Sequence, residues 1–220
     1  MTHQQTIDHV VGFHGHMCPG LAMGIRAAEV ALSEIGPHSS DEEVVAIVET
    51  DMCAVDAIQY LTGCTFGKGN LIHRDYGKNA YTFVRRSDGR ALRISTPAGG
   101  WNALGADWTQ LLGRIRAGVS TSEERHRFAA LQAARTERIL EAPLSELYEV
   151  CDVELEPPRP ARILTSLDCD LCGEPTMETR LIRLDARQLC PPCFDRAAAG
   201  AAPVPSPSSG HQAGEAEHAG

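Results

Sequence analysis

The sequence lacks any long hydrophobic segment and has no recognisable leader at its start. No apolar run approaches the roughly 18 residues that a membrane-spanning helix requires. Residues 1–8 carry neither the basic region nor the apolar run of a signal peptide. We therefore expect a cytoplasmic protein that makes no membrane contact.

The chain is also poor in positive charge. It has 20 Lys and Arg residues against 29 Asp and Glu residues, which gives a formal net charge of −9. Such a charge opposes general attraction to nucleic acids and anionic membranes. Residues 157–196 contain six Arg and six acidic residues, so they form no net basic patch either. Nucleic acid is therefore not expected as a partner.

Disulfide bonds are not expected, although the chain contains eight cysteines. A reducing cytoplasm favours metal ligands, reactive thiols or small buried residues instead. Four cysteines have the spacing of a zinc site: Cys169-x2-Cys172, then 17 residues, then Cys190-x2-Cys193. Two residues between ligands allow one tight turn to direct both sulfurs to one ion, and two such turns complete a closed tetrahedron. We expect structural zinc there, supplying much of the folding energy of the module.

A second cluster lies near the N-terminus, where His14, His16 and Cys18 fall within five residues. Cys18 directly precedes a predicted helix and Cys53 lies near the start of another, so helix amides would stabilise a thiolate at both positions. If the two helix starts meet, a second transition metal such as zinc, iron or copper could bind in this core pocket. The same groups also suit a thiol nucleophile with an imidazole base. Buried structural cysteines with incidental histidines are the remaining alternative.

Three further residues are candidates for the same pocket. Cys64 and Lys68 belong to a glycine-rich loop, residues 63–70, that could line the cavity. The loop follows a helix, and its Gly-x3-Gly-Lys spacing is one residue shorter than a Walker A phosphate loop. Lys68 is therefore expected to be a basic group that faces the pocket. Asp56, one helical turn after Cys53, either supports an imidazole or is a solvated surface acid.

The hydrophobic pattern predicts an α+β core. Apolar residues from Leu21 to Ile35 recur every three or four positions, as in an amphipathic helix, and Val44–Val48 is typical of a buried strand. The other expected elements are a helix from about residue 51 to residue 63, a hairpin of residues 78–86 and 91–95, and two helices, the second starting with a capping box at residues 120–124 and ending near residue 141.

A proline-rich segment marks the end of this core. Glu156–Pro160 is stiff and has no core-forming residues, so we place the domain boundary there. The expected domains are an α+β core at residues 1–156, a Pro-rich linker at 157–166, a small four-cysteine module of the zinc-ribbon or treble-clef type at 167–196, and a disordered tail at 197–220.

Three ordered blocks of the sequence resemble the FmdE family of formylmethanofuran dehydrogenase subunits. The blocks are Phe13–Arg26, Asp51–Gln59 and Thr62–Asn70, and the similarity extends over most of residues 5–155. The C-terminal module matches the longer members of that family. The resemblance implies an α+β core followed by a zinc finger, an intertwined homodimer, and a pocket whose positions here are His14, His16, Cys18, Cys53, Cys64 and Lys68.

The family name refers to a molybdenum- or tungsten-dependent complex that fixes carbon dioxide onto methanofuran. This sequence has no four-cysteine iron–sulfur run and no recognisable pterin site, so it does not itself carry out the redox step of such a complex. Our leading hypothesis is a metal-binding accessory protein that acts as a carrier, sensor or assembly factor for a metalloenzyme. The alternatives are an enzyme that uses Cys18 or Cys53 as a nucleophile or metal ligand, and a zinc-finger regulator that contacts a protein partner.

Overall fold

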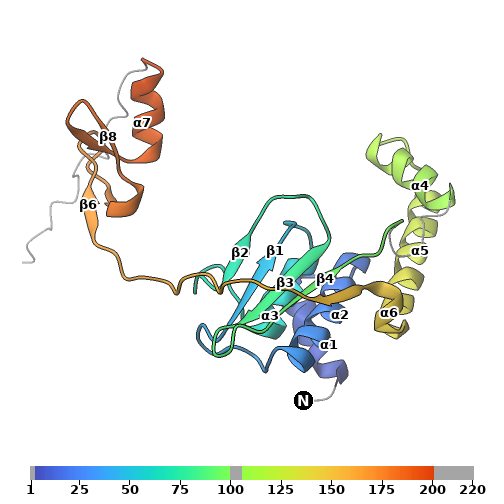
Figure 1. Cartoon of the computed structure of the whole chain (residues 1–220). Helices are drawn as coiled ribbons and strands as arrows, with labels where there is room; N and C mark the ends of the chain where they lie inside the picture. The colour runs from blue at the N-terminus through green and yellow to red at the C-terminus, as the bar shows by residue number, and fades with distance from the viewer. Residues whose placement is uncertain (1–2, 100–105, 201–220) are drawn as a thin grey trace, which may run out of the picture. The chain divides into compact units, whose positions relative to one another are not determined.

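The computed structural model describes residues 3–99 and 106–200 (Figure 1). These residues belong to two compact units, one within Met1–Ala161 and the other beginning at Arg162. Most of the predicted disordered tail, residues 201–220, lies outside the described residues, and a helix continues into its first part. Within the described residues, no helix is long and apolar enough to cross a membrane.

The first unit is the predicted α+β core, built on a five-stranded sheet with the strand order β2-β1-β3-β4-β5. β1 pairs in parallel with β2 and antiparallel with β3, and the other neighbouring strands are antiparallel. In chain order the described elements of this unit are α1 (His3–His14), α2 (Pro19–Glu34), β1 (Val44–Val48), α3 (Ala54–Thr62), β2 (Leu71–His73), β3 (Ala80–Arg85), β4 (Ala91–Ser95), α4 (Ala106–Arg116), α5 (Ser122–Glu141), α6 (Leu144–Leu147) and β5 (Glu149–Asp152).

β1 lies inside the sheet because all of its residues are apolar, and all five are buried. Its central residue, Ala46, lies opposite Leu71 of β2 and Phe83 of β3. Phe83 and Leu92 of β4 belong to the same hydrophobic cluster as Ile58 of α3, so this face of the sheet packs against the helices. The predicted buried strand and the predicted hairpin of β3 and β4 are confirmed.

Four elements of the core are absent from the sequence prediction: α1, β2, α6 and β5. α1 begins at His3, in a segment for which no helix or strand is predicted from the sequence. Only Ile7 and Val10 of α1 are buried, and both pack with Leu21 and Ile25 of α2. β2 has three residues, and the four residues of β5 are all exposed. These segments carry too few periodic apolar residues to give a recognisable pattern.

α2 and α3 pack together at very short range. A Cβ atom added to Gly24 would lie 2.6 Å from the Cα atom of Ala54 and even nearer to its carbonyl oxygen. Only glycine permits such a close backbone approach. One turn earlier, a Cβ atom on Gly20 would lie 3.2 Å from the Cβ atom of Cys53. The Gly-x3-Gly spacing therefore brings the N-terminal ends of the two helices together.

The proline-rich segment after β5 remains attached to the first unit as far as residue 161. The Val153 N–H donates to a carbonyl of β4, and the Arg86 guanidinium donates to the carbonyl of Pro158. The Ala161 N–H donates to the carboxylate of Glu42 at 3.0 Å. In Figure 1 this orange segment crosses in front of the sheet. The first part of the predicted linker is therefore held against the core.

The second unit has two hairpins, a short helix and very little hydrophobic core. Leu189 is fully buried, and the other buried residues of its hydrophobic cluster are four cysteines. Asp185 and Ala186 form the tight turn of one hairpin with φ values of 47° and 64°. The described elements are β6 (Ser166–Asp168), β7 (Pro175–Met177), the 3-10 helix η1 (Glu178–Arg180), β8 (Ile182–Leu184), β9 (Arg187–Leu189) and α7 (Pro191–Ala198).

The substitution Gly24→Ala is expected to destabilise the core. Alanine gains roughly 1 kcal/mol of helix propensity over glycine, whereas overpacking costs about 1–3 kcal/mol or more. No side-chain rotation can relieve a clash with the Ala54 backbone, so we expect a net loss of roughly 1–2 kcal/mol in urea unfolding followed by circular dichroism. Gly113→Ala in α4 is the matched control, because nothing lies within 4 Å of the added atom. Equal effects of the two substitutions would contradict the packing argument.

Candidate functional site

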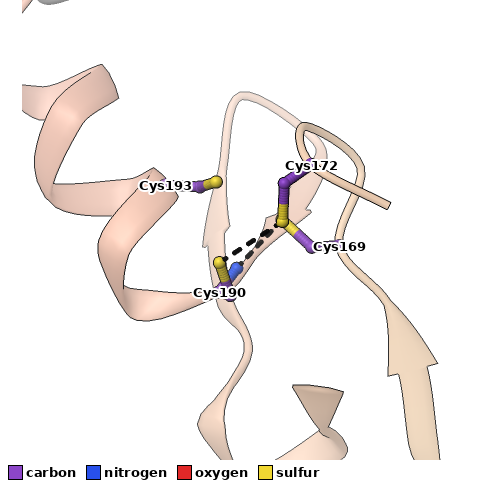
Figure 2. Close-up of side chains that lie close together, drawn as sticks. All are labelled: Cys169, Cys172, Cys190 and Cys193. Atoms are coloured by element: carbon purple, nitrogen blue, oxygen red, sulfur yellow. Dashed lines mark hydrogen bonds between the residues drawn. The ribbon is translucent and has the colours of Figure 1, made fainter. Parts of the chain in front are cut away.

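The four cysteines of the second unit come from two separate turns. Cys169 and Cys172 lie between β6 and β7, whereas Cys190 caps α7 and Cys193 lies in its first turn. Gly173 has a φ of 73°, in the left-handed region that favours glycine, so the chain can reverse directly after the second thiol. All four cysteines are buried, and Figure 2 shows their side chains gathered around a common centre.

The dimensions of this cluster fit one tetrahedral zinc ion. Its sulfurs lie within 4.8 Å of one another, and the Sγ atoms of Cys172 and Cys190 are 3.8 Å apart (Figure 2). Four sulfurs arranged tetrahedrally at about 2.3 Å from zinc would be separated by about 3.8 Å. The thiols therefore have the spacing of a closed structural zinc site.

Without a cation, ionisation of all four thiols is unfavourable near neutral pH. Burial raises the pKa of Cys169, but backbone N–H groups outweigh this effect and lower the pKa to about 6; one of them, from Cys190, lies 3.2 Å from the sulfur. Burial and the neighbouring thiols raise the pKa of Cys193 to about 12. The first thiolate to form therefore opposes ionisation of the others. A divalent cation removes this repulsion, which couples zinc binding to proton release and to folding.

His14, His16 and Cys18 form the second cluster, in the turn between α1 and α2. One ligand atom from each residue lies within 4.8 Å of the other two. The centroids of the two imidazole rings are 4.8 Å apart. Cys18 is the N-cap of α2, and its sulfur accepts a hydrogen bond from the Leu21 N–H at 3.3 Å. The structure thus brings these three predicted site residues together.

His14 is oriented as a metal ligand would be. Its Nδ1 atom lies 2.6 Å from Oδ2 of Asp56, in the first turn of α3. An ionised carboxylate only accepts hydrogen bonds, so Nδ1 of the neutral ring carries the proton and Nε2 presents a lone pair. Nε2 is buried and has no hydrogen-bond partner, a condition that buried polar atoms rarely show. Asp56 therefore supports an imidazole, the first of the two alternatives that the sequence allows.

Cys53 lies beside Cys18, but its chemistry differs from the prediction. The two side chains interact, and a Cβ atom on Gly20 would lie 3.8 Å from either sulfur. Cys53 does not belong to the compact group of His14, His16 and Cys18. It makes no side-chain cap hydrogen bond to α3, and burial, followed by the charge of Cys18, raises the pKa of its thiol. The prediction that helix amides stabilise a thiolate at Cys53 is therefore wrong.

Cys64 and Lys68 do not belong to the group of His14, His16 and Cys18. Cys64 is fully buried in the core, where its thiol donates to the carbonyl of Val44 at 3.4 Å. The Nζ atom of Lys68 donates to the carbonyl of Ser39 at 2.8 Å. Lys68 also lines an open cavity of about 790 Å³ beside Phe13, and the lining of this cavity includes none of the three clustered residues. Both residues hold the loop after α3 in place.

Gly20 and Gly24 shape the site, although neither is among the residues predicted from the sequence. They allow α2 to approach α3 closely enough for Cys18 to contact Cys53. The available signal was the spacing itself, because residues four positions apart lie on the same face of a helix. Two glycines at that spacing indicate a face that meets another backbone at short range.

Two family models match the chain. The model described as "FmdE, Molybdenum formylmethanofuran dehydrogenase operon" covers residues 13–149. The model described as "Prokaryotic dksA/traR C4-type zinc finger" covers residues 162–197, which include all four cysteines of the second unit. The resemblance predicted from the three sequence blocks and from the cysteine spacing is therefore confirmed.

Two of the proteins that are similar to this chain are a curated relative and a protein of known structure. An Archaeoglobus fulgidus protein described as "Probable S-adenosyl-L-methionine-binding protein" is 35% identical over 176 residues, which cover 77% of this chain and 48% of that protein. The chain thus spans about half the length of this curated relative. The crystal structure of a tungsten formylmethanofuran dehydrogenase FmdE-like protein from Syntrophus aciditrophicus covers 87% of this chain and 91% of its own, with a TM-score of 0.58 and 24% identity. That likeness shows a shared fold.

The substitution Cys172→Ser is expected to unfold the second unit and leave the core folded. One lost thiolate opens a site whose binding energy is the folding energy of the module. Limited proteolysis should then degrade residues 162–197 rapidly, while a fragment ending near residue 161 persists. Cys151→Ser, which removes an exposed thiol of the core, is the control and should change neither protection nor zinc content. A Cys172→Ser chain that stays protected and keeps its zinc would show that the ligand set is different.

Proposed function

The chain belongs to the FmdE family of formylmethanofuran dehydrogenase subunits, and on that basis we propose that it is a metal-binding accessory protein with two metal sites. One is the structural zinc site of the C-terminal finger. The other is a transition-metal site at His14, His16 and Cys18 in the core. The core site binds metal on behalf of a partner metalloenzyme, so the protein acts as a carrier, sensor or assembly factor. The zinc ion of the finger has a structural role.

The state of the His14 ring is the observation that carries this proposal. Its Nδ1 atom is engaged by Asp56, while Nε2 is buried and without a partner. The pairing of a carboxylate with one ring nitrogen is the usual support of a histidine that binds metal through the other nitrogen. Leaving a buried polar atom unsatisfied costs about 1–3 kcal/mol. A metal bond to Nε2 would offset that cost.

The donor set indicates which metals the core site would take. Imidazole and thiolate suit zinc, iron and copper, whereas magnesium and calcium prefer oxygen ligands. Three protein ligands leave one position open in a tetrahedral site, unlike the closed four-thiolate site of the finger. His16 is exposed and Cys18 is half-buried, so the site is accessible from solvent. An accessible and incompletely ligated site supports the reversible loading that a carrier or sensor requires.

The open position also favours one alternative function. In catalytic zinc sites, three protein ligands hold the ion and a water molecule or substrate occupies the remaining position. A metal-dependent enzyme centred on His14, His16 and Cys18 is therefore the second candidate. Turnover of a substrate by the metal-loaded chain would favour the enzyme, and metal transfer without turnover would favour the accessory protein.

We also propose a homodimer, a metalloenzyme partner and a cytoplasmic location. The family resemblance supports the homodimer. All eight cysteines are free thiols, which is consistent with a reducing compartment. Exposed Phe13 and Phe66 lie on the core surface, and aromatic residues of this kind are enriched in protein interfaces. These features support contacts with other proteins.

Elemental analysis of the purified full chain is expected to find about two metal equivalents per chain. His14→Ala and Cys18→Ser should each lower the content to about one, because a site with two remaining ligands holds metal poorly. The controls are His9→Ala, an exposed histidine of the same helix, and Cys151→Ser; both should keep about two equivalents. A wild-type chain that holds one equivalent, unchanged by Cys18→Ser, would refute the core metal site.

The substitution Asp56→Asn is expected to weaken metal binding at the core site by roughly 10–100-fold, because the partner that fixes the tautomer of the His14 ring is lost. Competition with a chromophoric chelator measures this affinity. Asp51→Asn is the control, since it removes the same charge from an exposed position just before α3. A similar loss in both variants would indicate a general effect of charge, and an unchanged affinity in Asp56→Asn would contradict the proposed orientation of His14.

A further inference from the structure

Cys18 and Cys53 occupy equivalent positions on two neighbouring helices. Cys18 is the N-cap of α2, and Cys53 is the N-cap of α3. The close packing of these helices at Gly24 holds their N-terminal ends together. Two thiols that lie far apart in the sequence are therefore neighbours in the fold.

Gly20 provides the space in which the two sulfurs meet. A Cβ atom at this position would lie 3.8 Å from the Sγ atom of Cys18 and 3.8 Å from that of Cys53. The two thiols also interact directly with each other. Both residues are partly exposed, so a small solute can reach them. Forming a disulfide requires the sulfurs to approach to about 2.05 Å, and no side chain at position 20 obstructs that movement.

Cys18 is shared between two arrangements. Its sulfur belongs to the compact group with His14 and His16, and it also contacts Cys53. A sulfur bonded in a disulfide is no longer a thiolate and loses its value as a metal ligand. Cys18 can therefore serve the metal or pair with Cys53, but not both at once.

We propose that Cys18 and Cys53 are a redox-modification site, at which a hydroperoxide forms a reversible disulfide that expels the core metal. The disulfide is independent of the proposed function, whereas the release of metal rests on it. The metal site is thus regulated by oxidation, and the chain unloads its core ion under oxidising conditions.

The chemistry needs one hydroperoxide and two thiols. One sulfur attacks the terminal oxygen of the hydroperoxide, which breaks the O–O bond and gives a sulfenic acid and an alcohol, or water when the oxidant is hydrogen peroxide. The second sulfur attacks the sulfenic sulfur, the S–S bond forms and the hydroxyl group leaves as water. Two thiols lose two electrons and two protons in total, and an external dithiol reverses the reaction.

The other core cysteines are unsuited to this reaction. Cys64 is fully buried, with its thiol donating to a backbone carbonyl. Cys151 is exposed on β5, where its sulfur contacts the carbonyl of Arg93 at 3.7 Å. Cys18 and Cys53 are therefore the pair in the core that combines mutual contact with access to solvent.

The test uses the full chain carrying Cys151→Ser, which removes the exposed thiol that would link separate molecules. The zinc-loaded protein is treated with hydrogen peroxide, and non-reducing peptide mapping by mass spectrometry identifies disulfides. A chromophoric chelator measures the zinc released. We expect a peptide that joins Cys18 to Cys53, the release of about one of two zinc equivalents, and recovery of both thiols and zinc binding after dithiothreitol treatment and reloading.

The matched variant adds Cys53→Ser, which leaves His14, His16 and Cys18 in place. It should release zinc at least about tenfold more slowly at the same peroxide dose. Two results would contradict the redox site and leave the proposed function unaffected. One is an equal rate of zinc release from the two variants. The other is the absence of a disulfide-linked Cys18–Cys53 peptide from a chain that holds two zinc equivalents. A chain that holds only one equivalent yet forms the disulfide would refute the core metal site and its regulation, while supporting the disulfide.

Discussion

The close contact between α2 and α3 is the constraint on which the core site depends. Gly24 lets the two helices meet backbone to backbone, and this sets the separation of the groups at their N-terminal ends. The His14–Asp56 hydrogen bond is 2.6 Å long. It joins the end of α1 to the first turn of α3. Hydrogen bonds weaken beyond roughly 3.2 Å, so a displacement of about 1 Å between α3 and the turn that leads into α2 would break it. The ring of His14 would then lose the partner that fixes its tautomer.

The two units of the protein are stabilised by different interactions. The core buries a five-stranded sheet against helices, so packing of apolar side chains stabilises it. The finger has one fully buried leucine, Leu189, which contributes about 1.5–3 kcal/mol. Structural zinc contributes on the order of 10 kcal/mol in small modules of this kind. Metal binding therefore contributes most of the folding free energy of the finger. The core is already stabilised by packing, so a metal ion there would serve function and would not be needed for folding.

The sequence predicts the features whose signals are local. The apolar period of α2, the capping box of α5 and the cysteine pairs of the finger each depend on residues a few positions apart. Contacts between distant segments are harder to foresee. The meeting of Cys18 with Cys53 requires the α2–α3 packing, which composition does not reveal. Gly63 ends α3 as predicted, with a φ of 71°, but the direction of the next residue follows from tertiary structure, and Cys64 contacts Val44 inside the core.

The edges of the sheet affect how the core can associate with other chains. The unpaired N–H and C=O groups of an edge strand can form hydrogen bonds with an extended segment of another chain. Proteins disfavour this pairing by keeping edge strands short and by placing charged side chains on them. β2 has only three residues, and β5 has Glu149 and Asp152 at its two ends. Growth of the sheet by addition of a foreign strand is therefore disfavoured at both sides. A second copy of this chain would be expected to join through helices and loops, which lowers the risk of open-ended aggregation.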